Sequence, residues 1–260
     1  MRCSAAERQA QIRKLLQDQP EVLISQLSEL FGVSEMTVRR DLDRLAADGQ
    51  LERTHGGARP SERLVLEFDF LGRRQARRND KRAIARAAVS IVERGHRLII
   101  DTGTTTLELA YLLKELEGIT VITPSLAVAS AIQFASGVET VLLGGSMRRG
   151  SPDLTGAITE TNLEMFAVDL AFLGADGIGL DGTLYSEDIQ IAHVDQKIRQ
   201  RAERTYVLAD SSKIGKTALA TNGMLTEVEA LITDEKITSE QVAALEQSGG
   251  TIIIAERGDR

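Results

Sequence analysis

The sequence predicts an α/β protein in two parts: an N-terminal winged helix-turn-helix domain and a C-terminal Rossmann-like α/β domain with a mostly parallel sheet. Three observations lead to this prediction. The 260 residues are enough for two domains. The first 60 residues contain three segments with apolar residues at helical spacing, and a glycine turn separates the last two. After residue 80, short apolar runs alternate with helical segments, as in sheets covered on both faces.

The N-terminal part is predicted to contain three helices. The first covers residues 5–17, where apolar side chains share one face. Residues 22–24 favour a short strand, and Ser25 is placed to cap a second helix. A Gly-Val turn then leads to Ser34, which is placed to cap a third helix that runs to about Asp48.

The phase of the third helix separates a core face from an outer face. Val38, Leu42 and Leu45 share one side and should face the core. A recognition helix meets DNA bases mainly through its N-terminal residues, so the candidate contacts are Ser34, Met36, Thr37, Arg39 and Arg40. Two adjacent arginines alone more often form a solvated face. The preceding helix, the turn and the segment that follows favour DNA contact here.

The segment after the third helix has the pattern of a wing. Residues 51–54 favour a strand that could pair with residues 22–24. His55-Gly56-Gly57 would permit a tight reversal, because glycine tolerates positive φ. Arg53, His55 and Arg59 are therefore candidates for contact with phosphate or the minor groove, and His55 is equally well explained as a turn residue.

The net charge of −7 is distributed unevenly along the chain. Residues 1–60 balance to zero, residues 61–86 carry +4, and residues 87–260 carry −11. This distribution suits a protein that touches nucleic acid with one end, although an acidic surface also aids solubility. No apolar run has the length of a membrane span, the first residues lack a secretory pattern, and Cys3 is the single cysteine. These features predict a cytoplasmic protein.

The C-terminal part is predicted to alternate helices and buried strands. Helices are expected near residues 84–92, 105–116, 126–134 and 191–202. A hairpin is expected around Asp181-Gly182. Strands are expected near residues 98–100, 121–122, 141–143, 170–173, 206–208, 230–232 and 252–254.

Several segments at the predicted strand ends have the composition of ligand-binding loops. In parallel sheets, ligands bind beyond the carboxyl ends of the strands. Residues 101–106 (Asp-Thr-Gly-Thr-Thr-Thr) open a helix, where backbone N–H groups and hydroxyls favour an anion. They are not a nucleotide P-loop, because no Gly-Lys-Ser/Thr follows, and they could also be only a well-capped turn. Segments 123–125, 143–145, 173–178 and 209–213 follow other strands, the last with Lys213 as a candidate partner for phosphate.

One long motif resembles a known family. It consists of Arg8, Ile12, Ser34-x-x-Thr37-Val38-Arg39-Arg40-Asp41-Leu42 and Arg53-x-His55-Gly56-Gly57-Ala58. This motif resembles the DeoR family of bacterial transcriptional regulators, and the remainder is similar to that family's sensor domain, which resembles the sugar-phosphate isomerase fold. The resemblance implies a phosphorylated sugar or polyol bound by Asp101, Gly103, Thr104, Thr105, Thr106, Thr123, Pro124, Ser125, Gly144, Gly145, Asp176, Glu187 and Lys213.

Two positions depart from the family pattern. Relatives often have Asn where this chain has Pro124, and a Lys where it has Asp195. The missing positive charge bears on whether the ligand carries a phosphate and on how the ligand lies.

The leading functional hypothesis is a DNA-binding repressor of a carbohydrate-utilisation operon, with a winged-helix domain over residues 1–60, a linker over 61–79 and a sugar-phosphate sensor over 80–260. The expected partners are double-stranded operator DNA, a small-molecule effector and further copies of the chain in a homodimer or homotetramer. No cofactor, metal or membrane partner is expected. An activator of the same architecture and a sugar-phosphate isomerase with an appended DNA-binding domain are the alternatives.

Overall fold

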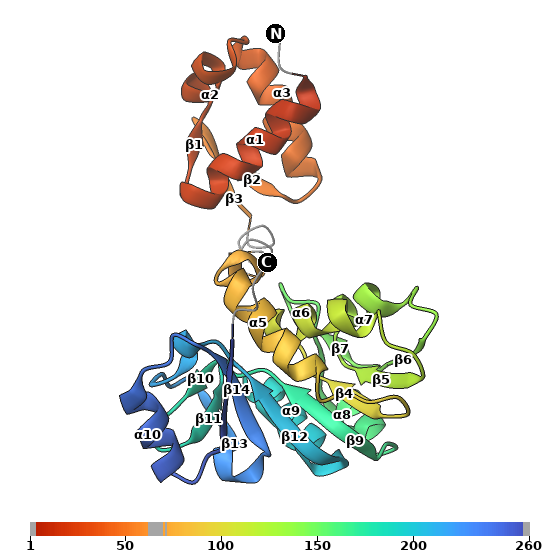
Figure 1. The fold of residues 1–260 in the computed structure, drawn as a ribbon. Coiled ribbons are helices and arrows are strands. Elements are labelled where there is room, and N and C mark those ends of the chain that lie inside the picture. Colours follow the sequence, from red (N-terminus) through yellow and green to blue (C-terminus); the bar gives the residue numbers. More distant parts are fainter. Residues whose placement is uncertain (1–3, 62–69, 71, 257–260) are drawn as a thin grey trace. The chain divides into compact units, whose positions relative to one another are not determined.

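The computed structural model describes residues 4–61, 70 and 72–256, and the chain divides into two compact units (Figure 1). The first, here called the head, comprises Met1–Arg73 with Arg149–Ser151, and the second, here called the body, comprises Arg74–Arg148 with Pro152–Arg260. Residues 62–69 and 71 of the predicted linker lie outside the described residues. The division at residues 60 and 79 therefore stays a prediction.

The head combines three helices with a small antiparallel sheet. Its elements are α1 (Ala5–Asp18), β1 (Val22–Leu23), α2 (Ile24–Phe31), α3 (Glu35–Ala47), β2 (Leu51–Arg53) and β3 (Gly57–Pro60). The core residues Val38 and Leu42 of α3 are fully buried together with Ile12 of α1. This arrangement confirms the predicted winged helix-turn-helix architecture and the predicted core face of α3.

The strand pairing in the head differs from the prediction. The strand order is β1-β3-β2, so residues 22–23 pair with β3 rather than with residues 51–54. The sequence of β3, Gly-Ala-Arg-Pro, gave no strand signal. Ser25 is not the helix cap, because α2 already begins at Ile24 and Leu23 occupies the cap position.

Gly57 is required for a reason other than the predicted one. Gly56 and Gly57 do not have positive φ. A Cβ atom on Gly57 would instead collide with the backbone carbonyl of Val22. The glycine therefore permits the close approach of β1 to β3, which brings the two strands into one sheet.

The body is built on a seven-stranded sheet whose neighbouring strands all run parallel. This confirms the predicted α/β class. The sheet order is β15-β14-β12-β9-β4-β5-β6. Its strands are β4 (Arg97–Ile100), β5 (Ile119–Thr123), β6 (Val138–Leu142), β9 (Val168–Leu173), β12 (Ala202–Leu208), β14 (Ala230–Asp234) and β15 (Ile252–Ala255).

Helices and smaller strands surround this sheet (Figure 1). The helices are α5 (Arg78–Val89), α6 (Thr104–Leu113), α7 (Leu126–Ile132), α8 (Ala157–Leu163), α9 (Ile189–Arg201), α10 (Ser239–Gln247), η1 (Ser211–Lys213) and η2 (Leu225–Glu227). The strands β7 (Ser146–Met147) and β8 (Leu154–Thr155) pair with each other. The strands β10 (Gly177–Ile178), β11 (Thr183–Ser186) and β13 (Ala220–Met224) form a third sheet, which contains the predicted hairpin.

Alternate residues of the central strands point into separate cores. Leu98 and Ile100 of β4 pack with α5, α6 and α7, whereas Ile99 packs with α8 and α9. The same alternation occurs in β9, where Phe172 joins the first core and Leu173 the second. Burial on both faces explains why these strands have continuous apolar sequences.

Among the described residues, no helix is long and apolar enough to span a membrane.

The order of the strands reverses between β4 and β9. The chain proceeds from β4 outward through β5 to β6, and then returns to place β9 on the other side of β4. Such a reversal opens a crevice at the carboxyl ends of the two strands. In this protein those ends are occupied by Asp101 and Gly174.

Candidate functional site

The residues predicted for DNA contact lie at the start of α3. Ser34 caps α3, and its hydroxyl accepts a hydrogen bond from the Thr37 backbone N–H at 3.3 Å. Met36 is 60% exposed, and Arg39 and Arg40 are also exposed. Arg40 makes no hydrogen bond or ion pair with any residue that the structure describes, whereas Arg39 lies 3.7 Å from Glu35. The outer face therefore offers one free guanidinium and one weakly paired guanidinium.

Two basic residues of the wing, Arg53 and Arg59, form ion pairs with carboxylates. The Arg53 guanidinium donates to Asp43 at 2.9 Å, and that of Arg59 donates to Glu52 at 2.7 Å. His55 is exposed at the turn between β2 and β3. Exposed ion pairs are weak, so Arg59 can exchange its carboxylate for a phosphate, while Arg53 also braces the wing against α3 through the Arg39 carbonyl.

A buried ion pair, which the sequence did not predict, holds α3 to α1. Arg8 Nε lies 2.8 Å from Asp41 Oδ2, and Gln9 donates to the other carboxylate oxygen at 3.1 Å. Both side chains of the Arg8–Asp41 pair are about nine-tenths buried. The only available signal was the presence of both residues in the family motif.

The glycine-threonine segment after β4, which is the predicted anion cradle, opens helix α6 at the carboxyl end of that strand. Gly103 has φ of 119° and occupies the cap position of α6, where no side chain of the described residues caps the helix. Thr104 is half-buried, Thr105 is buried, and the Thr106 hydroxyl donates to the Gly103 carbonyl at 3.1 Å. The first backbone N–H groups of α6 are thus available to an anion.

The segments that follow β5 and β6 are more tightly packed than the segment that follows β4. The Ser125 N–H donates to the Thr123 hydroxyl at 3.0 Å, and both residues are buried with Pro124. The Gly144 N–H donates to Asn162 at 2.9 Å and its carbonyl accepts from Thr159, while a Cβ atom on Gly145 would collide with the Thr159 hydroxyl. The predicted glycines Gly144 and Gly145 therefore allow close packing against α8.

Three further predicted residues follow β9, β11 and β12. Asp176 accepts a hydrogen bond from the Glu187 backbone N–H at 2.9 Å, which joins the loops after β9 and β11. The Glu187 side chain is exposed, and Lys213 is half-buried in η1. Lys213 makes no hydrogen bond or ion pair with the α6 cradle among the residues that the structure describes, and β9 separates β12 from β4 in the sheet order.

Two buried carboxyl groups face the strand reversal. Asp101 accepts from the Gly174 N–H at 3.1 Å, and Asp195 accepts from Ser186 at 2.9 Å and from Asn222 at 2.6 Å. Burial raises the pKa of Asp101 well above its usual value, and the charge of Asp195 raises that pKa further. Burial also raises the pKa of Asp195 to about 7, although the hydrogen bonds from Ser186 and Asn222 oppose this shift. Ser186 and Asn222 complement the carboxyl group at this departure from the family pattern, and nothing in the sequence singled them out.

The pKa of Asp195 predicts a stability that depends on pH. A carboxyl group whose pKa is raised on folding stabilises the folded state below its unfolded pKa of about 4, and this contribution is lost as the pH rises through about 7. Asp195→Asn should therefore reduce the decline of the melting temperature between pH 5 and 8. At pH 8 the variant should melt at a higher temperature than the wild type, by roughly 2–4 °C for each kcal/mol of unfolding free energy gained. Differential scanning fluorimetry across this range measures the effect.

Asp181→Asn provides the control for this experiment. The Thr183 N–H lowers the pKa of Asp181, so that group titrates below the measured range. Its replacement should leave the slope unchanged. An Asp195→Asn slope equal to that of the wild type would contradict the assignment of the titration to Asp195.

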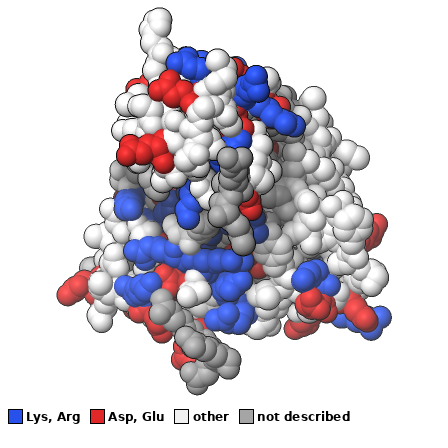
Figure 2. All heavy atoms as spheres, turned by 90° about the horizontal axis from the view of Figure 1, so that it is seen from above, with Lys and Arg blue, Asp and Glu red and all other residues white. Residues whose placement is uncertain are grey.

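The start of the body lies against these strand-end loops. Arg77 has φ of 52°, and its guanidinium lies 3.7 Å from Asp210 and 3.4 Å from the Ser211 hydroxyl. Arg78 approaches Glu108 of α6 at 3.3 Å. Figure 2 shows Lys and Arg side chains gathered in a band rather than evenly spread. The contacts of Arg77 and Arg78 favour a structural function for them in the body.

Two family comparisons together match most of the chain. Residues 8–63 match the DeoR-like helix-turn-helix domain, and residues 76–235 match the DeoR C terminal sensor domain. The chain belongs to the DeoR family. It is accordingly a regulator with a DNA-binding helix-turn-helix and a sensor domain.

Curated relatives of this DeoR-family chain agree over nearly their full length. A protein of Escherichia coli O157:H7 named "Putative aga operon transcriptional repressor" is 33% identical, over 96% of this chain and 93% of that protein. The "Glycerol-3-phosphate regulon repressor" of Escherichia coli strain K12 is 30% identical, over 86% of this chain and 88% of that protein. Among solved structures, ribose 5-phosphate isomerase A from Methanocaldococcus jannaschii covers 52% of this chain and 53% of its own, with 21% identity and a TM-score of 0.39.

Proposed function

We propose that this DeoR-family regulator represses a carbohydrate-utilisation operon and that a phosphorylated sugar, bound in the crevice of the body, changes its operator affinity. The observation that carries the DNA-binding half is the outer face of α3, where Arg40 is exposed and unpaired within the described residues while Val38 is fully buried behind it. The uncapped start of α6, beside the strand reversal, supports the proposal that the effector binds in the crevice.

Regulation follows if the effector favours one of two arrangements of an oligomer. One head offers a single recognition helix, whereas operator half-sites are read by paired heads at a fixed spacing. We therefore propose a homodimer or homotetramer whose head spacing changes when the crevice is filled. The ligand can shift this equilibrium only through its different affinity for the two arrangements.

The crevice is proposed to bind its sugar rather than to convert it. Asp101 Oδ2 is engaged by the Gly174 backbone N–H, and the raised pKa of Asp101 favours its neutral form. Incubation of the purified protein with pentose and hexosamine phosphates should give no isomerised product. Turnover of any of them would support an isomerase instead.

A two-step experiment tests the proposed function. Thermal-shift measurements with sugar phosphates, free sugars and acidic sugars first identify stabilising ligands, because a ligand that binds the folded state raises its melting temperature. Gel shifts with DNA selected from a random pool then show whether the same ligand releases the DNA. A stabilising sugar that leaves DNA binding unchanged would contradict the regulatory coupling.

Thr104→Arg should block the response to the effector while leaving DNA binding intact. Thr104 is half-buried at the first turn of α6, so a long cationic side chain there would fill the cradle with less disturbance than at the buried Thr105. The ligand found in the thermal-shift panel should lose its stabilising effect on this variant. Thr251→Arg is the matched control. Thr251 is exposed and precedes β15, so it lies at the amino ends of the strands, whereas the cradle lies at their carboxyl ends. A normal response of Thr104→Arg would remove the cradle assignment.

A further inference from the structure

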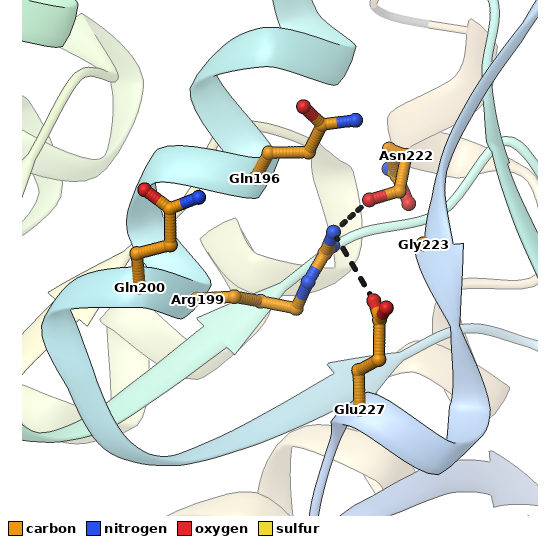
Figure 3. A pocket seen from close by; sticks show the side chains of 6 residues that line it. All are labelled: Gln196, Arg199, Gln200, Asn222, Gly223 and Glu227. Carbon is orange, nitrogen blue, oxygen red and sulfur yellow. Dashed lines mark hydrogen bonds and ion pairs between the residues drawn. The ribbon is translucent and has the colours of Figure 1, made fainter.

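A second pocket lies in the body at the far end of α9 from the crevice (Figure 3). It has a volume of about 370 Å³, within the range of small-ligand sites. Its lining comes from α9, β13 and η2: Gln196, Arg199, Gln200, Asn222, Gly223 and Glu227. Because α9 begins at Ile189 beside the strand ends, Arg199 lies roughly 15 Å along the helix from them.

Arg199 is the cation of this pocket and is largely withheld from water. Its side chain is 10% exposed, and its Nη2 donates to the backbone carbonyl of Asn222. Its Nη1 is buried and has no hydrogen-bond partner among the residues that the structure describes. Burial lowers the pKa of Arg199, although the charges of Glu227 and Asp195 oppose this shift. A buried guanidinium donor without an acceptor is costly unless a ligand supplies one.

The backbone of β13 is shaped around this guanidinium. Gly223 has φ of 149°, and a Cβ atom there would lie within 2.5 Å of Arg199 Nη2. Any other residue would displace the arginine. The absence of a side chain therefore keeps the guanidinium at the pocket wall.

Two amide side chains complete the polar lining. Gln196 and Gln200 are one helical turn apart on α9, and Figure 3 shows both side chains beside that of Arg199. Each amide can donate two hydrogen bonds to an acceptor in the pocket. The pocket thus combines one charged donor with neutral donors, which is a suitable set for an oxyanion.

Glu227 is the group that such an anion must replace. Its carboxylate lies 3.7 Å from Arg199 Nη2, beyond hydrogen-bond distance, and its side chain is 54% exposed. It also accepts a hydrogen bond from the Met224 N–H at 3.2 Å. This partly exposed pair is weak, so a better-placed oxyanion can compete with it.

We propose that this pocket binds a small oxyanion, a carboxylate or a phosphate, through the Arg199 guanidinium and the amides of Gln196 and Gln200, with displacement of Glu227. The site is separate from the crevice and does not depend on the proposed regulatory function. Asn222 connects the pocket with the buried carboxyl group of Asp195. Its backbone carbonyl accepts a hydrogen bond from Arg199, and its side-chain amide donates one to Asp195.

The test uses the full-length protein with sodium phosphate and sodium acetate as probes, titrated by calorimetry at constant ionic strength. Arg199→Gln should weaken binding of the preferred probe by about tenfold, since a hydrogen bond to a charged donor is lost. Glu227→Gln should tighten it, because the competing carboxylate is gone. The probe that responds to both variants identifies the anion class.

Lys197→Gln is the matched control, because Lys197 belongs to the same helix turn but pairs with Glu164 outside the pocket. It should not change the affinity. Phosphate bound at the α6 cradle would be insensitive to all three variants. Unchanged affinity of both probes in Arg199→Gln, or weaker binding in Glu227→Gln, would overturn the inference. If Arg199→Gln fails to fold by circular dichroism, the direction of the Glu227→Gln effect decides.

Discussion

Arg40→Ala is expected to lower specific operator affinity by about 5- to 150-fold without unfolding the head. The reason is that a well-placed arginine contact to a base contributes about 1–3 kcal/mol of discrimination. Arg40 is exposed and makes no ion pair with the described residues, so its removal should cost the fold little. Gel shifts on DNA selected by the wild-type protein measure the loss, and circular dichroism checks the fold.

The salt dependence of binding distinguishes two kinds of contact by Arg40. If the side chain reads a base, the variant should lose affinity mainly for the selected DNA. If it grips a phosphate, all sequences should weaken alike and the salt slope should fall by about one. Arg13→Ala, at an exposed position of α1, is the control. Undiminished specific binding by Arg40→Ala would remove Arg40 from the recognition surface.

Asp41→Ala is expected to unfold the head. This substitution leaves the buried Arg8 guanidinium without its carboxylate, and breaking a buried pair in this way costs about 3–5 kcal/mol. A domain of this size has little more stability than that. Thermal and urea unfolding followed by circular dichroism should show early loss of helical signal, and DNA binding should disappear with it.

Asp43→Ala provides a close comparison on the same helix. Asp43 pairs with Arg53 at 2.9 Å, but its side chain is 66% exposed. An exposed pair contributes at most about 1 kcal/mol, so this variant should stay folded. Equal stability of Asp41→Ala and Asp43→Ala would show that burial of the Arg8–Asp41 pair does not support the head.

Much of the fold could be predicted because burial imposes a period on the sequence. Val38, Leu42 and Leu45 recur at helical spacing, and their burial in the structure follows from that spacing. The strands of the body were recognisable because both faces are covered, so their residues are apolar without interruption. β3 was missed because only a few backbone hydrogen bonds to β1 and β2 define it.

The sites could be predicted less completely, because they depend on contacts between distant segments. The strand ends were expected to meet at one edge, and the Asp101–Gly174 hydrogen bond shows such a meeting. Ser186 and Asn222 became visible only when β11 and β13 brought them to Asp195. The pocket at Arg199 likewise depends on the β13 backbone, which has no pattern in the sequence.

The place of β9 beside β4 also has a consequence for synthesis of the chain. Leu98 pairs with Leu170, so the two sides of the strand reversal are joined only after more than half of the chain has left the ribosome. Strands β4, β5 and β6 can form earlier, because they follow one another along the sequence. A product that ends before Val168 would keep every predicted DNA contact of the head but could not form the crevice. Premature termination before β9 should therefore yield fragments that cannot respond to the effector.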